Sequence, residues 1–215
     1  MKMIDIYEHD FFHNCRCTLK EASKNDAKKD DIKYMTESKL PAINFDKAKD
    51  NYIKDMELSS TPLSNDALLI INGRLMFIEF KDGHMDKEIY DVRRKIFESL
   101  LIVLDILDKT IKYSRDNISY ILVYNEQVNE EYINKIIETR KKEEAKKLGK
   151  NEVLESSAFN LLSKTISNYA NYQMDIFGLE KHFKKLYFKD VHTYSKEEFE
   201  KFLTQETADS GVGSF

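Results

Sequence analysis

The stretch SNDALLIINGRLMFIEFKDG, residues 64–83, decides the fold. It contains two apolar runs, residues 67–71 and 75–78, which are joined by Asn72 and Gly73. Asn-Gly between two such runs predicts a β-hairpin with a two-residue type I′ turn, because that turn needs positive φ at both central positions. The sequence therefore predicts two antiparallel neighbouring strands at this point of the chain.

The length of the turn determines which residues of the two strands pair. With Asn-Gly as the loop, Ile71 pairs with Arg74, and further out Asp66 lies directly opposite Glu79. Opposed residues share a face of the sheet, with Cβ atoms about 4.5–5.5 Å apart. Lys81 follows two residues after Glu79 and points to the same face. We therefore expect Asp66, Glu79 and Lys81 to form one cluster at the open end of the hairpin.

Two opposed carboxylates repel each other, so this pair is destabilising unless a cation lies between them. Mg²⁺ is a hard cation that proteins hold through one or two carboxylates together with water. An adjacent lysine can orient or deprotonate a water, or neutralise charge that develops on a phosphate. The cluster is therefore typical of a metal-dependent site for phosphate chemistry.

The spacing of these residues resembles the PD-(D/E)xK nuclease superfamily, whose members carry Asp at the start of one strand and Glu-x-Lys on the next. Here Asp66 is followed, after twelve intervening residues, by Glu79-Phe80-Lys81. The resemblance covers residues 62–81, and the literal Pro-Asp dipeptide is absent because the proline stands four residues before the aspartate.

The resemblance implies a restriction-endonuclease-like α/β fold, with a central mixed β-sheet that carries the Asp/Glu-x-Lys hairpin, flanking helices and extra C-terminal helices. It also implies a hydrolase, a metal-dependent nuclease that cleaves phosphodiester bonds of DNA or RNA in a defence, mobile-element or repair context. Asp66, Glu79 and the Phe80 carbonyl would bind Mg²⁺ or Mn²⁺, and Lys81 would position the attacking water.

Other interpretations of the motif stay open. Both strands are apolar on both faces, so the hairpin is expected to be covered on both sides. Glu79 and Lys81 would then follow the buried part of a strand and need partners. A structural ion pair is one alternative. A catalytically inactive nuclease fold, acting as a binding or immunity-type protein through protein–protein contacts, is the other.

The composition is that of a globular protein, with 41% hydrophobic and 33% charged residues in a chain of 215. We expect one α/β nuclease-like domain over residues 1–205, with a poorly defined N-terminal segment (1–40), a helical insertion (130–172) and a flexible tail (206–215). Because there is no signal-peptide core and no apolar run near 18 residues, we expect a cytoplasmic protein without a membrane partner.

Nucleic acid is the expected partner, although the net charge of −4 does not favour a broad nucleic-acid-binding surface. Local basic faces can still bind phosphate. The expected helix at 130–147 mixes basic and acidic residues, which indicates a solvated helix, with a nucleic-acid arm as the alternative. A homodimer is implied by the resemblance alone.

Apolar spacing predicts the remaining helices and strands. Helices are expected at residues 45–58, 86–112, 130–147, 153–172 and 195–203, and strands at 118–124 and 186–191. The helix at 86–112 is apolar almost all round in its middle, so we expect it to pack centrally on the sheet. Ser195 and Glu198 form a capping box for the last helix. A first strand before Asp66 is expected from the resemblance, which does not locate it.

Further site residues are suggested but not selected by the sequence. By resemblance, a helix before the sheet adds an acidic ligand, for which Glu57 and, behind it, Glu37 are candidates; each is otherwise an exposed acid. One of the three basic residues 93–95 could face the site and hold a substrate phosphate. The alternative is a solvated face paired with Asp91 and Glu98.

The N-terminal segment contains His9, His13, Cys15 and Cys17, a run that invites a zinc interpretation. It lacks the usual gap of two to four residues between the cysteines and a second ligand pair. Cysteines one residue apart also make a poor disulfide, so we expect two reduced thiols.

Overall fold

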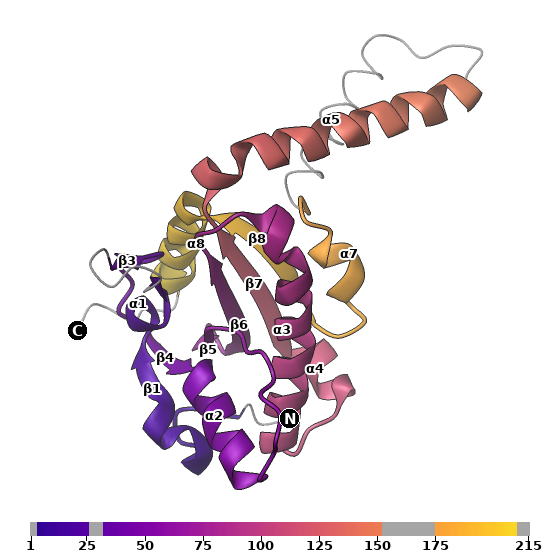
Figure 1. Cartoon of the computed structure of the whole chain (residues 1–215). Coiled ribbons are helices and arrows are strands. Elements are labelled where there is room, and N and C mark those ends of the chain that lie inside the picture. The colour runs from indigo at the N-terminus through magenta and orange to yellow at the C-terminus, as the bar shows by residue number, and fades with distance from the viewer. Residues whose placement is uncertain (1–3, 26–31, 152–174, 210–215) are drawn as a thin grey trace.

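The computed structural model describes residues 4–25, 32–151 and 175–209. Its centre is a six-stranded mixed sheet in the order β1-β4-β5-β6-β7-β8, and β2 pairs with β3 in a separate two-stranded sheet (Figure 1). The strands are β1 (Arg16–Thr18), β2 (Lys24–Asn25), β3 (Lys33–Tyr34), β4 (Pro41–Asn44), β5 (Ala67–Ile71), β6 (Arg74–Lys81), β7 (Ile118–Tyr124) and β8 (Val191–Ser195).

The predicted hairpin is β5–β6, and its register is confirmed. Ile71 pairs with Arg74, and the ladder continues outward to Ala67 and Ile78. The two turn residues have positive φ, 47° at Asn72 and 73° at Gly73, as a type I′ turn requires.

The helices surround the sheet, and the mixed α/β class is confirmed. They are η1 (Asp10–Cys15, a 3₁₀ helix), α1 (Leu19–Ala22), α2 (Phe45–Asp55), α3 (Met85–Ile106), α4 (Ile111–Asn117), α5 (Glu126–Asn151), α7 (Leu179–Phe183) and α8 (Lys196–Asp209). The strand predicted at 118–124 is β7, which lies parallel to β6 after the α3–α4 crossover. Because β4, β5 and β6 are antiparallel and β6, β7 and β8 are parallel, the sheet is mixed.

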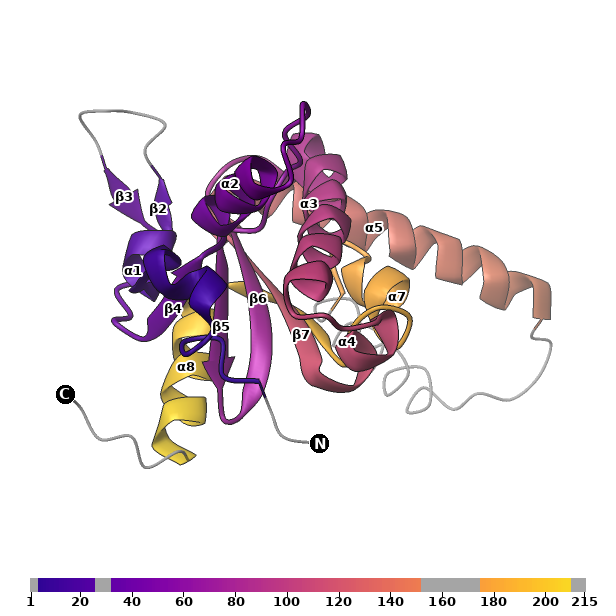
Figure 2. The same ribbon diagram turned by 90° about the horizontal axis from the view of Figure 1, so that it is seen from below.

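Two apolar layers cover the sheet, because alternate residues of the hairpin point to opposite faces. Leu68 and Phe77 belong to the larger core, together with α2 and α3. Leu69 and Ile78 belong to the smaller core, together with α1 and α8. Figure 2 shows α2 and α3 on one side of the sheet and α8 on the other. The side chains at the even-numbered positions of β5, Leu68 and Ile70, therefore point to the side of the sheet that α2 and α3 cover.

Several expected boundaries are wrong. The helix expected at 86–112 is two helices, since α3 ends at Ile106 and Asp108 takes a positive φ of 49° before α4 begins. The strand expected at 186–191 lies instead at Val191–Ser195, where buried residues alternate with half-buried ones. Leu186 is 56% exposed and follows Lys185, whose φ of 64° is incompatible with a strand.

The two ends of the domain also differ from expectation. The N-terminal segment 1–40 contributes η1 and the edge strand β1, which pairs with β4. β4 also pairs with β5 and is the strand before Asp66 that the sequence left unlocated. At the C-terminus α8 continues to Asp209, so residues 206–209 are helical rather than part of a tail. Its predicted capping box is present: the Ser195 N–H donates to Glu198 Oε2 at 2.8 Å.

α5 begins at Glu126, four residues before the expected start, and Figure 1 shows it extending away from the sheet. The helix expected at 153–172 lies outside the described residues. Within the described ranges, none of the helices has the length and apolar composition that a membrane span needs.

Candidate functional site

The three residues of the motif meet at one end of the hairpin. Asp66 directly precedes β5, while Glu79 and Lys81 lie at the end of β6. The Glu79 side chain is fully buried, whereas the side chains of Asp66 and Lys81 are 19% and 15% exposed. The predicted cluster therefore exists, and its two outer members reach solvent.

Asp66 is held against β6 by a hydrogen bond where the ladder stops. The Phe80 N–H donates to Asp66 Oδ2 at 2.6 Å. In an extended strand the N–H and the C=O of one residue point to the same edge. The Lys81 carbonyl points to the opposite edge, since it accepts the Asn125 N–H at 2.9 Å. The Phe80 carbonyl therefore lies on the Asp66 side of β6, where the resemblance places a metal ligand.

A second lysine, which the motif does not contain, lies between the two carboxylates. Lys95 on α3 places its Nζ 2.7 Å from Glu79 Oε1 and 3.6 Å from Asp66 Oδ1. Lys81 Nζ lies 3.2 Å from the same Glu79 oxygen and 2.9 Å from Glu88 Oε2. The cation that two opposed carboxylates require is thus supplied, in this structure, by the chain itself.

The basic residues 93–95 lie in different surroundings, and the Nε of Arg93 is buried without a hydrogen-bond partner among the described residues. Lys95 faces the site, while Arg94 turns outward and donates to Glu98 Oε1 at 3.0 Å, four residues on. One sequence signal distinguishes them: on a 3.6-residue helix, Lys95 lies beside the buried positions Val92 and Ile96. Lys95 is therefore on the flank of the face that packs on the sheet.

Burial and mutual repulsion set the charge state of the carboxylates. Burial, followed by the charge of Glu79, raises the pKa of Asp66 above its ordinary range, against the opposing effect of Lys95. Burial also raises the pKa of Glu79, although Lys95 and Lys81 both oppose it. Both acids therefore take up protons more readily than exposed carboxylates do.

The two ammonium groups show the complementary effect. Burial alone would lower the pKa of Lys95, but Glu79 and Asp66 outweigh it and the pKa is raised. The pKa of Lys81 is likewise raised, because Glu79 and Glu88 outweigh burial and the repulsion from Lys95. Both lysines are therefore cationic at neutral pH, and neither is a general base there.

Neither acid that the sequence suggested as an additional ligand lies at the site. Glu37 forms an ion pair with Lys20 at 2.6 Å. Glu57 follows the far end of α2, about 16 Å along the helix axis from its first residue. The acid that α2 does bring close is Asp46, in its first turn: it accepts a hydrogen bond from Ser64, two residues before Asp66, and its charge acts on Lys95.

The oxygen atoms present fit a hard divalent cation. Glu79 Oε2 is buried and, among the described residues, has no hydrogen-bond partner. A metal bound here would find two carboxylates and the Phe80 carbonyl, a set that suits Mg²⁺ or Mn²⁺ completed by water. Within the described ranges, no three His, Cys, Asp or Glu side chains are grouped so that they could hold a metal ion. For a metal ion to bind here, the Lys95 ammonium would also have to move away from the two carboxylates.

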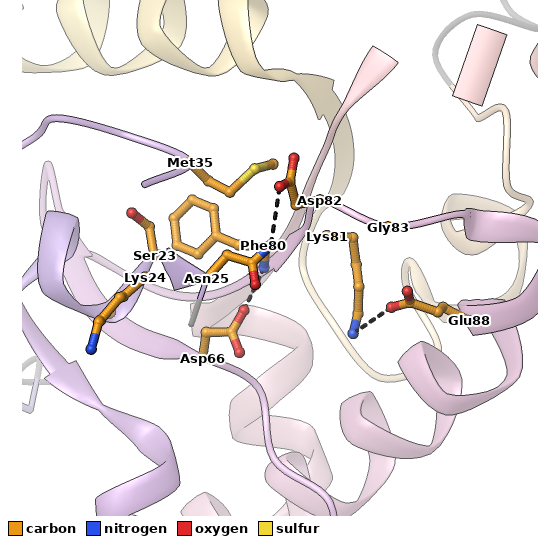
Figure 3. Close-up of a pocket in the computed structure, with 11 residues that line it drawn as sticks. Ser23, Lys24, Asn25, Met35, Asp66, Phe80, Lys81, Asp82, Gly83 and Glu88 are labelled. Carbon is orange, nitrogen blue, oxygen red and sulfur yellow. Dashed lines mark hydrogen bonds and ion pairs between the residues drawn. The ribbon is translucent and has the colours of Figure 1, made fainter. Parts of the chain in front are cut away.

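A pocket of about 270 Å³ opens onto the site (Figure 3). Asp66, Lys81 and Glu88 line it on the side of the hairpin and α3, and Lys24, Asn25 and Met35 are among the residues of its other wall. Among the dashed lines in Figure 3 are those that join Lys81 to Glu88 and Asn25 to Asp82.

Asp82 connects the two walls of the pocket. Its carboxylate accepts hydrogen bonds from Asn25 at 3.0 Å and from Asn125 at 2.6 Å. Burial would raise the pKa of Asp82, but these two amide donors, together with the charges of Lys196 and Lys33, outweigh it and the pKa is lowered. Asp82 is therefore a carboxylate that ties β2 to the ends of β6 and β7, directly after the motif.

Cys15 and His9 of the N-terminal His/Cys run have different hydrogen-bond partners. Cys15 is buried and its Sγ accepts from Asn51 at 3.3 Å, and the His9 side chain accepts from the Phe11 N–H at the start of η1. Both cysteines are free thiols whose pKa is raised by burial.

Comparison of the chain with protein-family models, with curated proteins and with solved structures gives no match.

Proposed function

We propose that this protein is a metal-dependent nuclease of the PD-(D/E)xK type, with a restriction-endonuclease-like sheet, which hydrolyses phosphodiester bonds of DNA or RNA. One observation carries the proposal: Asp66 and Lys81 line an open pocket, and the Lys81 ammonium lies 3.2 Å from the buried carboxylate of Glu79. An ion cluster that served only to stabilise the fold would not require such an opening.

Each residue of the site has a role in this reaction. Asp66, Glu79 and the Phe80 carbonyl would hold Mg²⁺ or Mn²⁺, which when bound lowers the pKa of a coordinated water and supplies positive charge beside the phosphate. Lys81 lines the pocket and is held by Glu88, so that its ammonium can position the attacking water and stabilise charge on the phosphoryl oxygens.

The topology supports the restriction-endonuclease-like assignment. The motif lies on an antiparallel hairpin, and the chain then crosses through α3 and α4 to the parallel strand β7. A reducing cytoplasm agrees with the free cysteines. The homodimer, as part of the proposal, is supported by apolar side chains exposed along one face of α3, namely Tyr90, Phe97 and Leu101.

One observation favours a second function, a catalytically inactive binding protein of the same fold. Lys95 already neutralises Glu79 and Asp66 from within the chain, so the carboxylates can be accommodated without a metal. A protein of this kind would use the fold to bind a partner protein, and its pocket would serve no reaction.

Cleavage assays separate the two functions. The full chain is incubated with Mg²⁺ or Mn²⁺ and with single- and double-stranded DNA and RNA, beside Asp66→Asn and Lys81→Met. We expect cleavage of at least one substrate and a loss of about 100-fold or more in each variant. Asp91→Asn and Lys87→Met, at exposed positions on α3, are the matched controls and should cleave normally.

The outcomes are distinct. Cleavage that persists in both site variants refutes the proposed site. Folded protein that cleaves none of the substrates favours the binding role instead.

A further inference from the structure

Lys95 occupies the position that a metal ion would need. Its Nζ lies 2.7 Å from Glu79 Oε1 and 3.6 Å from Asp66 Oδ1. The other oxygen of Asp66 already accepts the Phe80 N–H. A cation held by both carboxylates would therefore compete with Lys95 for Asp66 Oδ1 and Glu79 Oε1, while the buried Glu79 Oε2 has no hydrogen-bond partner among the described residues.

Lys95 differs from Lys81 in its partners. Lys81 is shared between Glu79 and Glu88, and so remains paired if it leaves Glu79. Both ion pairs of Lys95, among the described residues, are with the two carboxylates of the motif. Its side chain is 19% exposed and comes from α3, whose packing on the sheet holds the backbone of Lys95 close to the pair.

Two cations cannot share these oxygens without strong repulsion. Like charges about 4 Å apart repel each other strongly at the effective dielectric of a protein site, and a divalent ion doubles the repulsion that a single charge exerts. Binding of a metal between Asp66 and Glu79 must therefore be coupled to withdrawal of the Lys95 ammonium.

We propose that Lys95 is a resident cation of the site, which holds Asp66 and Glu79 together in the metal-free protein and is displaced when a divalent ion binds. The inference rests on the metal site of the proposed function and adds its regulation. Lys95 is a positioning residue: it keeps the carboxylates in place for the metal, and its competition sets how much metal the site requires.

The first test measures Mn²⁺ binding and stability without nucleic acid. Lys95→Met in the full chain keeps the length of the side chain and removes its charge. Calorimetry should show Mn²⁺ bound at least tenfold more tightly than by the wild type. In EDTA the melting temperature should fall by about 5 °C or more, and saturating Mn²⁺ should restore most of the loss.

Lys87→Met, exposed on the same helix, is the matched control and should change neither quantity. Unchanged or weaker Mn²⁺ binding by a folded Lys95→Met overturns the inference, as does a loss of stability that Mn²⁺ does not restore. Failure of Lys95→Met to bind Mn²⁺ at all also overturns it.

A second measurement uses the wild-type chain, so that it does not depend on the folding of a variant. An amine-specific reagent is added with and without Mn²⁺, and modification of Lys95 and Lys87 is followed by mass spectrometry. Displacement from the carboxylates predicts modification of Lys95 several-fold faster with Mn²⁺, at an unchanged rate for Lys87. An unchanged or slower rate at Lys95 overturns the inference.

These readouts are independent of catalysis. If Lys95→Met binds Mn²⁺ more tightly but the wild type cleaves no nucleic acid, the resident cation is supported and the nuclease is refuted. Cleavage by the wild type with equal Mn²⁺ binding in both proteins supports the nuclease and refutes the resident cation.

Discussion

Replacement of Asp66 by Asn is expected to stabilise the metal-free protein. Asp66 is 19% exposed and shares one face of the sheet with the fully buried Glu79. An Asn side chain keeps an oxygen that can accept the Phe80 N–H, which the aspartate accepts at 2.6 Å. The substitution therefore removes the negative charge while preserving the hydrogen bond that positions the side chain.

The magnitude follows from three opposing effects. Losing the attraction to Lys95, whose Nζ lies 3.6 Å from Asp66 Oδ1, costs about 4–5 kcal/mol at an effective dielectric of about 20. Removing the repulsion from Glu79 at about 5 Å returns about 3 kcal/mol. Avoiding burial of a carboxylate returns several more, reduced because Asp66 is partly exposed. The net gain is about 1–2 kcal/mol.

The pH dependence of this gain follows from the raised pKa of Asp66. Below the ordinary aspartate pKa, Asp66 is protonated in both the folded and the unfolded chain, so aspartate and asparagine are nearly equivalent. As the pH rises, the unfolded chain loses the proton first and the wild type loses stability relative to the variant. The difference should therefore be near zero at about pH 3 and largest at about pH 8.

Urea denaturation in EDTA measures this difference, with Asp91→Asn on the exposed side of α3 as the control. An equal slope of the free energy of unfolding against urea concentration in the wild type and Asp66→Asn would show that their unfolded states are comparable. A lower stability of Asp66→Asn at pH 8 would refute the reasoning, because the attraction of Lys95 would then exceed burial and repulsion together.

Three further outcomes are expected. Burial raises the pKa of both Asp66 and Glu79, so the affinity for Mn²⁺ should fall on acidification already between about pH 7 and 6. Calorimetry that shows a constant affinity down to pH 5 would contradict the raised pKa values. Lys81→Met should lose about 100-fold in cleavage while keeping the Mn²⁺ affinity within a few-fold, and a primary defect in metal binding would argue against its role at the phosphate. Asp82→Ala should lower the free energy of unfolding by about 1–2 kcal/mol, because two amide hydrogen bonds are lost. It should also speed the exchange of backbone amide hydrogens in β2 and β3. Unchanged exchange would show that Asp82 does not hold the pocket wall.

Local signals were sufficient for the hairpin. The Asn72-Gly73 turn sets the register through backbone sterics alone, and the register brings Asp66, Glu79 and Lys81 to one end of one face. The apolar spacing of α3 and the β-branched and aromatic residues of β7 identified these two elements for the same reason. These features depend on residues close in the sequence, so their pattern is visible in the chain.

Weak local signals led to the errors at element ends. The break between α3 and α4 depends on a single residue, Asp108, in a left-handed conformation that periodicity does not detect. β8 is half polar, with His192 and Tyr194 between its buried residues, so the more apolar segment just before it was a better match to a strand. In both cases tertiary packing decided between two patterns of similar local strength.

The sequence by itself determined the hairpin, its register and the three ionisable residues of the motif, because a two-residue turn leaves the backbone few alternatives. Only the tertiary structure decided what surrounds them: Lys95 between the carboxylates, Asp46 at the start of α2, and the pocket closed by β2 and Asp82. Those contacts join elements far apart in the chain, and their distances depend on how α2 and α3 pack on the sheet, which no local pattern of residues encodes.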